Sequence, residues 1–268
     1  MSKKKIVIPV SFTYFTLALT AYTFIPSQFA NGEESSLGET GHEWSYEGET
    51  GPNHWAELDP LNSACANGTE QSPINIQKAQ AKEAAELENL EISYTSSPFS
   101  LVNNGHTVQG NIQTDKNSIV LNGKEYTLAQ FHFHTPSEHL INGNAYDMEL
   151  HLVHKDKDGQ LAVLGILIKE GKENTVLKQA WNAIPKEKTT EEINVSEPID
   201  LAHILPKNQH TYQYAGSLTT PPCSEGVQWV VFKQPIEMSK EQINTFRHIF
   251  PDDHRPVQAI GEREVIKN

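Results

Sequence analysis

The strongest constraint on this chain of 268 residues is a run in which aromatic and imidazole side chains alternate, Gln130-Phe131-His132-Phe133-His134. Successive side chains of a β-strand point to opposite faces of a sheet. His132 and His134 therefore share one face, and Phe131 and Phe133 share the other. The run predicts a strand with two imidazoles on one side and an apolar surface on the other.

A second run with the same alternation, Glu149-Leu150-His151-Leu152-Val153-His154, follows farther along the chain. It places Glu149 and His151 on one face of a second strand. If the two strands pair, three imidazoles converge, which is the ligand count of a catalytic zinc site with its fourth position open to water. Gln130 and Glu149 would then lie where hydrogen-bond partners hold the ligand rings through their other nitrogens.

Two other interpretations of these histidines stand beside the zinc site. A histidine on a strand is often a satisfied polar residue, and a lone His-x-His spacing is weak support for a metal. Cupins also use His-x-His followed by a glutamate, and His132-x-His134-x-x-x-Glu138 fits the start of that pattern. In a cupin the glutamate is itself a ligand and the metal is usually iron or manganese, so other segments have to decide.

The first thirty residues have the composition of a secretory signal peptide. Lys3-Lys4-Lys5 precede an apolar run from Ile6 to Ile25, and small residues follow. This order is typical of a leader that is removed on export. An uncleaved membrane anchor is the alternative, but Pro9 and Ser11 interrupt the run. We expect residues 1–30 to be cleaved, leaving a secreted or extracytoplasmic protein without stable membrane insertion.

Loss of this leader would remove three lysines and no acid, so the formal net charge would change from −13 to −16. A protein with this charge repels nucleic acid and anionic membrane surfaces. We therefore expect no nucleic-acid partner.

The chain has only two cysteines, Cys65 and Cys223. In an exported protein an isolated pair usually forms one disulfide, and the alternative is two buried thiols. Neither cysteine lies in a Cys-x-x-Cys motif, which argues against a zinc ribbon.

Short alternating runs dominate the sequence from Asn53 onward. The predicted strands are Leu90 to Tyr94, His106 to Ile112, Ser118 to Leu121, Glu149 to His154 and Leu161 to Ile168. Tight-turn signals such as Asn122-Gly123 separate them. The turn from Asp156 to Gly159 predicts a hairpin between the last two runs.

Helical patterns are few. They cover Thr175 to Ile184 and Ser239 to Phe250, where Ser239 is a candidate N-cap. The segment from Lys78 to Asn89 reads as a surface loop or a short turn. Because there is no repeat and no linker, we expect residues 31–268 to form one mainly β domain. It would have a large, mostly antiparallel twisted central sheet and a few short peripheral helices.

Several motifs together resemble the α-class carbonic anhydrases of the bacterial, exported type. They occur in the family's order over roughly residues 42 to 265, and an ordered set of this size excludes the cupin interpretation. The matching segments are EQSPINI (Glu70 to Ile76), NNGH (Asn103 to His106), QFHFH (Gln130 to His134), SEH (Ser137 to His139), ELHLVH (Glu149 to His154), LAVLGI (Leu161 to Ile166), YAGSLTTPPC (Tyr214 to Cys223) and RPVQ (Arg255 to Gln258).

The resemblance implies a lyase that reversibly hydrates carbon dioxide to bicarbonate and a proton. His132, His134 and His151 would hold Zn²⁺, and zinc-bound hydroxide would attack the substrate. Thr219 would accept a hydrogen bond from the hydroxide and donate its own proton to Glu138. A lone pair of the hydroxide would then face the carbon dioxide.

The resemblance also assigns the walls of the cavity. His106 would be the proton shuttle, because an imidazole with a pKa near neutrality accepts and releases protons at working pH. His139 would be a structural histidine. The apolar substrate pocket would be formed by Val153, Val163, Leu218, Val227 and Trp229. The polar side would be lined by Tyr46, Asn104, Gln109 and Thr220.

Two segments depart from the family pattern. Thr135-Pro136 replaces Trp-Gly after the second ligand, and the run to Glu138 is shorter. Asp253 stands where the family has Asn, and we expect this change to affect packing behind the metal strands more than the chemistry. Cys65 and Cys223 match a disulfide of extracellular and bacterial members.

The resemblance further implies inhibition by sulfonamides and anions, and a monomer or homodimer. A binding protein that kept the fold without catalysis, and a zinc hydrolase that acts on esters, are the competing functions. Both are weaker expectations, because the three ligand histidines, Glu138 and Thr219 are all present.

Overall fold

Three adjacent strands with alternating or continuously apolar sequences form the centre of the molecule. They are β7 (Lys124–His134), β9 (Met148–Lys155) and β10 (Leu161–Glu170). The computed structural model describes residues 43–84 and 90–268, so the predicted signal peptide lies outside the described residues. The predicted hairpin between β9 and β10 is confirmed, and the side chain of Asp156 accepts hydrogen bonds from two backbone N–H groups of its turn.

The remaining elements are short. The strands are β1 (Asn75–Ile76), β2 (Lys82–Glu83), β3 (Glu91–Ser93), β4 (Phe99–Asn103), β5 (Val108–Ile112), β6 (Ser118–Leu121), β8 (Leu140–Ile141), β11 (Ile193–Asn194), β12 (Thr211–Ser217), β13 (Glu225–Phe232), β14 (Ile236–Met238) and β15 (Ile266–Lys267). The helices are η1 (Gly48–Thr50), α1 (Trp55–Leu58), η2 (Pro60–Asn62), α2 (Ala64–Asn67), α3 (Lys178–Asn182), η3 (Leu201–Ile204) and α4 (Lys240–Ile249).

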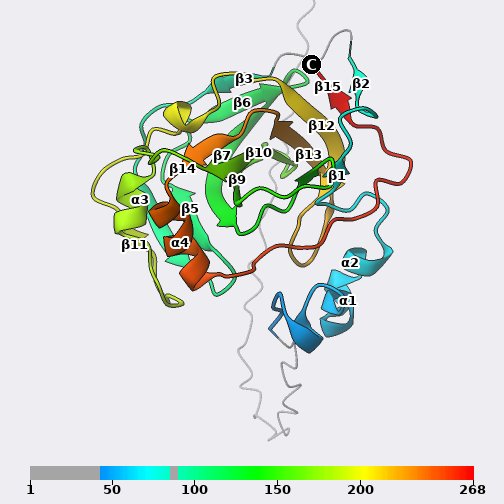
Figure 1. Ribbon diagram of the computed structural model, residues 1–268, viewed down its shortest axis with the longest axis horizontal. Helices are drawn as coiled ribbons and strands as arrows, with labels where there is room; N and C mark the ends of the chain where they lie inside the picture. Colours follow the sequence, from blue (N-terminus) through cyan, green and yellow to red (C-terminus); the bar gives the residue numbers. More distant parts are fainter. Residues whose placement is uncertain (1–42, 85–89) are drawn as a thin grey trace, which may run out of the picture. The chain divides into compact units, whose positions relative to one another are not determined.

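One large mixed sheet joins most of these strands in the order β11-β4-β5-β7-β9-β10-β13-β12-β15-β2 (Figure 1). The predicted mainly β architecture with few short helices is confirmed, and most neighbouring strands are antiparallel. Strand β10 pairs in parallel with β13 and with β14, and β15 pairs in parallel with β2. Parallel neighbours need a long connection, and local turn signals do not reveal such pairings.

The two faces of the central strands have different surroundings. Phe131 and Phe133 on β7 point into the main apolar core, together with Leu150 and Leu152 on β9. Helices α3 and α4 lie side by side against this core (Figure 1), and the indole of Trp181 on α3 donates to a backbone carbonyl of α4. The histidines therefore lie on the opposite face, as the alternation predicts.

Both predicted helices are present, but only one has nearly the predicted length. Helix α4 begins after Ser239, whose side chain and Gln242 form a reciprocal capping box. Helix α3 is shorter than the predicted range from Thr175 to Ile184. Pro185 follows that range, and the residue before a proline avoids helical geometry. Within the segment predicted as a loop or turn, the structure has a turn and then β2, and residues 85–89 lie outside the description.

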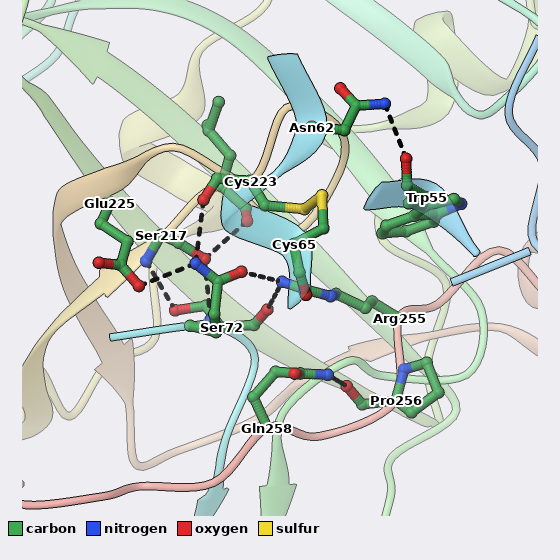
Figure 2. The surroundings of a disulfide bond; sticks show 12 residues. Trp55, Asn62, Cys65, Ser72, Ser217, Cys223, Glu225, Arg255, Pro256 and Gln258 are labelled. Atoms are coloured by element: carbon green, nitrogen blue, oxygen red, sulfur yellow. Dashed lines mark hydrogen bonds between the residues drawn. A yellow bond between two sulfur atoms is a disulfide. The ribbon is translucent and has the colours of Figure 1, made fainter. Parts of the chain in front are cut away.

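The two cysteines form a disulfide that joins α2 to the loop after β12 (Figure 2). Cys65 and Cys223 are separated by 158 residues in sequence. Around the bond, the side chain of Gln71 donates to the carbonyl of Cys223, and Arg255 donates to that of Cys65. Among the described residues, no helix is long and apolar enough to cross a membrane.

Replacing both cysteines in the variant Cys65→Ala/Cys223→Ala should lower the free energy of unfolding by about 5 kcal/mol. The disulfide closes a very long loop and restricts the unfolded chain. Urea unfolding of the variant and of reduced wild-type protein measures the change, and the two should agree. A loss below about 1 kcal/mol would contradict this account of the bond.

Candidate metal centre

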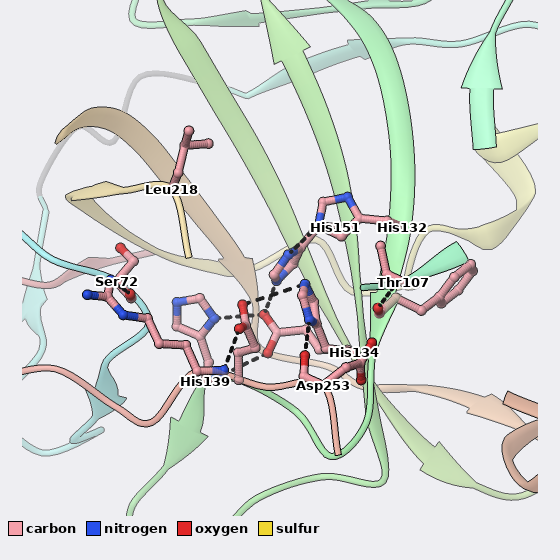
Figure 3. Close-up of polar contacts among 12 residues, drawn as sticks. Ser72, Thr107, His132, His134, His139, His151, Leu218 and Asp253 are labelled. Carbon is pink, nitrogen blue, oxygen red and sulfur yellow. Dashed lines mark hydrogen bonds and ion pairs between the residues drawn. The ribbon is translucent and has the colours of Figure 1, made fainter. Parts of the chain in front are cut away.

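Three histidines converge on one face of the two central strands. His132 and His134 lie two residues apart on β7, and His151 on β9 is paired directly with His132 in the antiparallel register. Figure 3 shows the three rings turned toward one another. The ring centroids of His134 and His151 are 4.7 Å apart, and His134 and His151 are buried.

Each ring uses one nitrogen in a hydrogen bond to an acceptor. The Nδ1 of His132 lies 2.8 Å from Gln130 Oε1, and the Nδ1 of His134 lies 2.7 Å from the carbonyl oxygen of Asp253. The Nε2 of His151 lies 2.9 Å from Glu149 Oε1. These partners can only accept, so each of these nitrogens carries the proton. The proton-free nitrogens are then Nε2 of His132, Nε2 of His134 and Nδ1 of His151.

The proton-free nitrogens face a common point. One ligand atom from each histidine lies within 4.8 Å of the other two. Nδ1 of His151 is 3.3 Å from Nε2 of His132, and Nε2 of His134 is buried without a hydrogen-bond partner among the described residues. Burial lowers the pKa of all three rings, that of His134 to about 4. Three neutral imidazole lone pairs crowded together fit a divalent cation such as zinc.

The buried carboxylate of Glu149 holds the ring of His151 in place through a hydrogen bond. Its Oε1 accepts from His151 and from Nδ1 of His139 at 2.7 Å, and its Oε2 accepts from the backbone N–H of His139. Burial by itself raises the pKa of Glu149, but the charges and hydrogen bonds of His139 and His151 outweigh it and hold that pKa well below its usual range. Because Nδ1 of His139 and Nε2 of His151 both donate to Glu149, only Nδ1 of His151 is left without a proton.

Glu138 lies beside His134. Its Oε2 is 3.6 Å from Nε2 of His134, and its Oε1 accepts from the backbone N–H of Arg255 at 2.9 Å. Burial raises the pKa of Glu138, and the hydrogen bond from the backbone N–H of Arg255 counteracts part of that rise. No described group donates to Glu138 Oε2 with normal hydrogen-bond geometry.

Thr219 belongs to the loop that follows β12. The N–H of Leu218 donates to Ser224 and that of Cys223 donates to Thr220, so the loop is closed on itself and linked to α2 by the disulfide. Thr219 is buried and Thr220 is partly exposed.

The predicted pocket residues form one apolar cluster on the face of the sheet that carries the three histidines. Val163 on β10 is paired with Val153 on β9 and with Trp229 on β13, so the three lie in one row across the sheet. Val227 is buried in the same cluster, and Leu218 packs against it. The ring of Trp229 is 4.9 Å from that of His151.

His106 occupies the turn between β4 and β5. The side chain of Asn104 accepts from the backbone N–H groups of His106 and Thr107, so Asn104 builds this turn. The imidazole stacks on Trp44 with centroids 3.6 Å apart, and 19 % of the His106 side chain is exposed. Burial lowers the pKa of His106 below its usual value. Glu43 Oε1 lies 3.9 Å from its Nε2.

The other predicted polar residues are Gln109 and Tyr46. Gln109 on β5 is paired with His132 across the sheet. The hydroxyl of Tyr46 is buried without a described partner, and burial raises its pKa well above the usual value.

Three contributions were not predicted from sequence. The carbonyl of Asp253 holds His134, the N–H of Arg255 holds Glu138, and the ring of Trp44 covers His106. The contact of Asp253 with His134 is made by its backbone, so it does not depend on the side chain at this position. Every residue has a backbone carbonyl, and almost every residue has a backbone N–H, so the residue type does not reveal such contacts. Arg255 was nevertheless singled out as the first residue of the RPVQ motif.

Comparison with known proteins gives a consistent result. The model of the family described as eukaryotic-type carbonic anhydrase matches residues 50–268. A carbonic anhydrase of Klebsiella pneumoniae is 42% identical over 226 residues, which cover 84% of this chain and 90% of that protein.

Two solved structures are similar throughout the described domain. An α-carbonic anhydrase of Thermovibrio ammonificans, in complex with the inhibitor sulfanilamide, has a TM-score of 0.81 and 45% identity, covering 84% of this chain and 98% of its own. An α-carbonic anhydrase of Photobacterium profundum has a TM-score of 0.77 and 38% identity, covering 84% and 100%.

The variant Glu149→Gln should bind zinc about 10- to 100-fold more weakly than wild type, because the amide no longer fixes the tautomer of His151. Competition with a colorimetric chelator measures the affinity. Glu91→Gln, an exposed change of the same kind on β3, is the matched control and should bind zinc like wild type. Equal affinity of both variants would contradict the role given to Glu149.

Proposed function

Because the chain belongs to the eukaryotic-type, or α-class, carbonic anhydrase family, we propose that it reversibly hydrates carbon dioxide with one zinc ion held by His132, His134 and His151. The family's enzymes are lyases. The observation that carries the proposal is the set of three proton-free nitrogens that face one point, each backed by an acceptor on its other nitrogen. When bound there, zinc supplies a Lewis acid that lowers the pKa of a coordinated water to about 7.

Thr219 and Glu138 orient the reacting water. A hydroxyl that donates its only proton to a carboxylate can only accept from its other partner. Thr219 therefore accepts a hydrogen bond from the water, and this contact turns a lone pair of the water toward the substrate. The N–H of Arg255, which donates to Glu138, favours the ionised carboxylate that this arrangement needs.

The apolar wall provides the place for carbon dioxide. The substrate is small and carries no charge, so it gains from a dry surface and needs few polar contacts. Val163, Val153 and Trp229 form this surface in one row beside His151. Bicarbonate, which is charged, is held poorly by such a surface and leaves.

His106 carries the proton from the site to buffer. Its burial against Trp44 lowers its pKa, so the ring is mainly neutral at pH 7 and ready to accept a proton. The exposed part of its side chain lets it release that proton to solvent. Tyr46, Thr220 and Gln109 order the intervening waters.

The protein acts outside the cytoplasm as the product of leader cleavage. The disulfide between Cys65 and Cys223 is compatible with an oxidising compartment, and the sequence of residues 1–30 has the order of a signal peptide. The related structure with sulfanilamide supports sulfonamides as inhibitors of this chain.

Stopped-flow measurement of carbon dioxide hydration tests the function. Purified protein should contain about one zinc per chain by elemental analysis. Activity should vanish after chelation, return with zinc, and be blocked by a sulfonamide. The variant His134→Ala should lack both zinc and activity. Hydration by the metal-free protein, or none by the zinc-loaded protein, would refute the proposal.

The variant His106→Ala should lower the turnover number about 10-fold or more in dilute buffer, because the proton loses its carrier. Added imidazole should restore much of the rate, while kcat/KM stays near the wild-type value. His210→Ala, which removes an exposed histidine, is the control and should change neither. Full turnover of His106→Ala without imidazole would remove His106 from the mechanism.

A further inference from the structure

Two rows of side chains cross the metal face next to the ligands. Gln109 on β5 is paired with the ligand His132 on β7. Two residues farther along β5, Asn111 is paired with Gln130 on β7 and with Ser100 on β4. Residues two apart on a strand share a face. Asn111 therefore lies beside Gln109 on the side of the sheet that carries the metal ligands.

A chain of hydrogen bonds runs along these rows to a charged residue. The Nε2 of Gln109 donates to Asn111 Oδ1 at 2.6 Å, and Asn111 Nδ2 donates to Glu192 Oε1 at 2.7 Å. The hydroxyl of Ser100 donates to Glu192 Oε2. Glu192 directly precedes β11, which pairs with β4 at the edge of the sheet, so the topology brings it to this place.

The carboxylate at the end of this chain determines the direction of every bond in it. An ionised carboxylate only accepts hydrogen bonds, so Asn111 has to present its NH₂ group to Glu192. The carbonyl oxygen of Asn111 then points to Gln109, so Gln109 has to donate from its own NH₂ group. The carboxylate fixes these directions because it offers no proton of its own to either amide.

The consequence is a free acceptor beside the metal site. With Nε2 of Gln109 committed to Asn111, its Oε1 receives no hydrogen bond from the described residues. Gln109 is only partly buried, so water can reach it.

We propose that Glu192 is a positioning residue that holds Gln109 with its carbonyl oxygen toward the cavity water. There the oxygen orients the water chain that leads from the metal to His106. Glu192 touches none of the reacting atoms and acts through Asn111 alone. This inference rests on the proposed hydration activity and on proton export through water.

Reversing the charge at position 192 should reverse the direction of the hydrogen bonds between residue 192, Asn111 and Gln109. The lysine in Glu192→Lys only donates, so Asn111 turns its carbonyl to the lysine and its NH₂ group to Gln109. Gln109 then presents its NH₂ group to the cavity. Proton export should slow by about 2- to 10-fold, the factor equivalent to one neutral hydrogen bond. The turnover number in dilute buffer should fall by that factor, and kcat/KM should stay unchanged.

Two further variants separate positioning from charge and stability. Glu191→Lys makes the same charge change on the neighbouring exposed residue and should leave both constants unchanged. In Glu192→Lys/Asn111→Asp, the new carboxylate accepts both from the lysine and from Gln109. The original orientation of Gln109 and the turnover number should then be restored. If Glu192 served stability alone, Glu192→Lys would lower the melting temperature. The turnover number would then neither fall in this variant nor recover in the double variant.

Neutron diffraction of the deuterated wild-type protein tests the orientation without any substitution. The two deuterons of the Gln109 amide should lie on the atom that faces Asn111. Deuterons on the cavity side would overturn the proposal. Equal turnover of Glu192→Lys and Glu191→Lys, or no rescue by Asn111→Asp, would also overturn it. Absence of zinc-dependent hydration in wild type would instead be a failure of the proposed function.

Discussion

The register between β7 and β9 is the constraint on which the rest of the structure depends. It places His132 directly opposite His151. Because neighbouring side chains alternate between the two faces, Phe131 lies opposite Leu152 on the other face. A slip of one residue would move every imidazole into the apolar core and every apolar side chain into the site. The burial of the aromatic and leucine side chains thus selects the same register that brings the three histidines together, and stability and site geometry have one cause.

Distant segments then orient the rings that this register gathers. The C-terminal segment contributes the carbonyl of Asp253 to His134 and the N–H of Arg255 to Glu138. On the other side, His139 connects Glu149 to the hydroxyl of Tyr214, which bonds to Ser72 in the N-terminal half. Buried polar groups of this kind are costly unless they are satisfied. The site therefore requires most of the chain to be folded before its imidazoles are held in one tautomer.

The sequence predicts those parts that depend on periodicity and residue type. The alternation around His132 and His151 predicts both strands and the shared face, and the turn at Asp156 predicts their neighbouring hairpin. Other features depend on tertiary contacts between segments far apart. The parallel pairing of β10 with β13, the carbonyl of Asp253 and the stacking of Trp44 on His106 have no local signature. Backbone acceptors are available at every residue, so sequence does not single them out.

A crystal structure of zinc-loaded protein, with anomalous scattering measured at the zinc edge, tests the central claim most directly. One ion should be bonded at about 2.0–2.1 Å to three nitrogens, namely Nε2 of His132, Nε2 of His134 and Nδ1 of His151, with a water as the fourth ligand. The second nitrogen of each ring should keep its present acceptor. An ion bound through Glu138 or Glu149, or through the opposite nitrogen of any ring, would contradict the account.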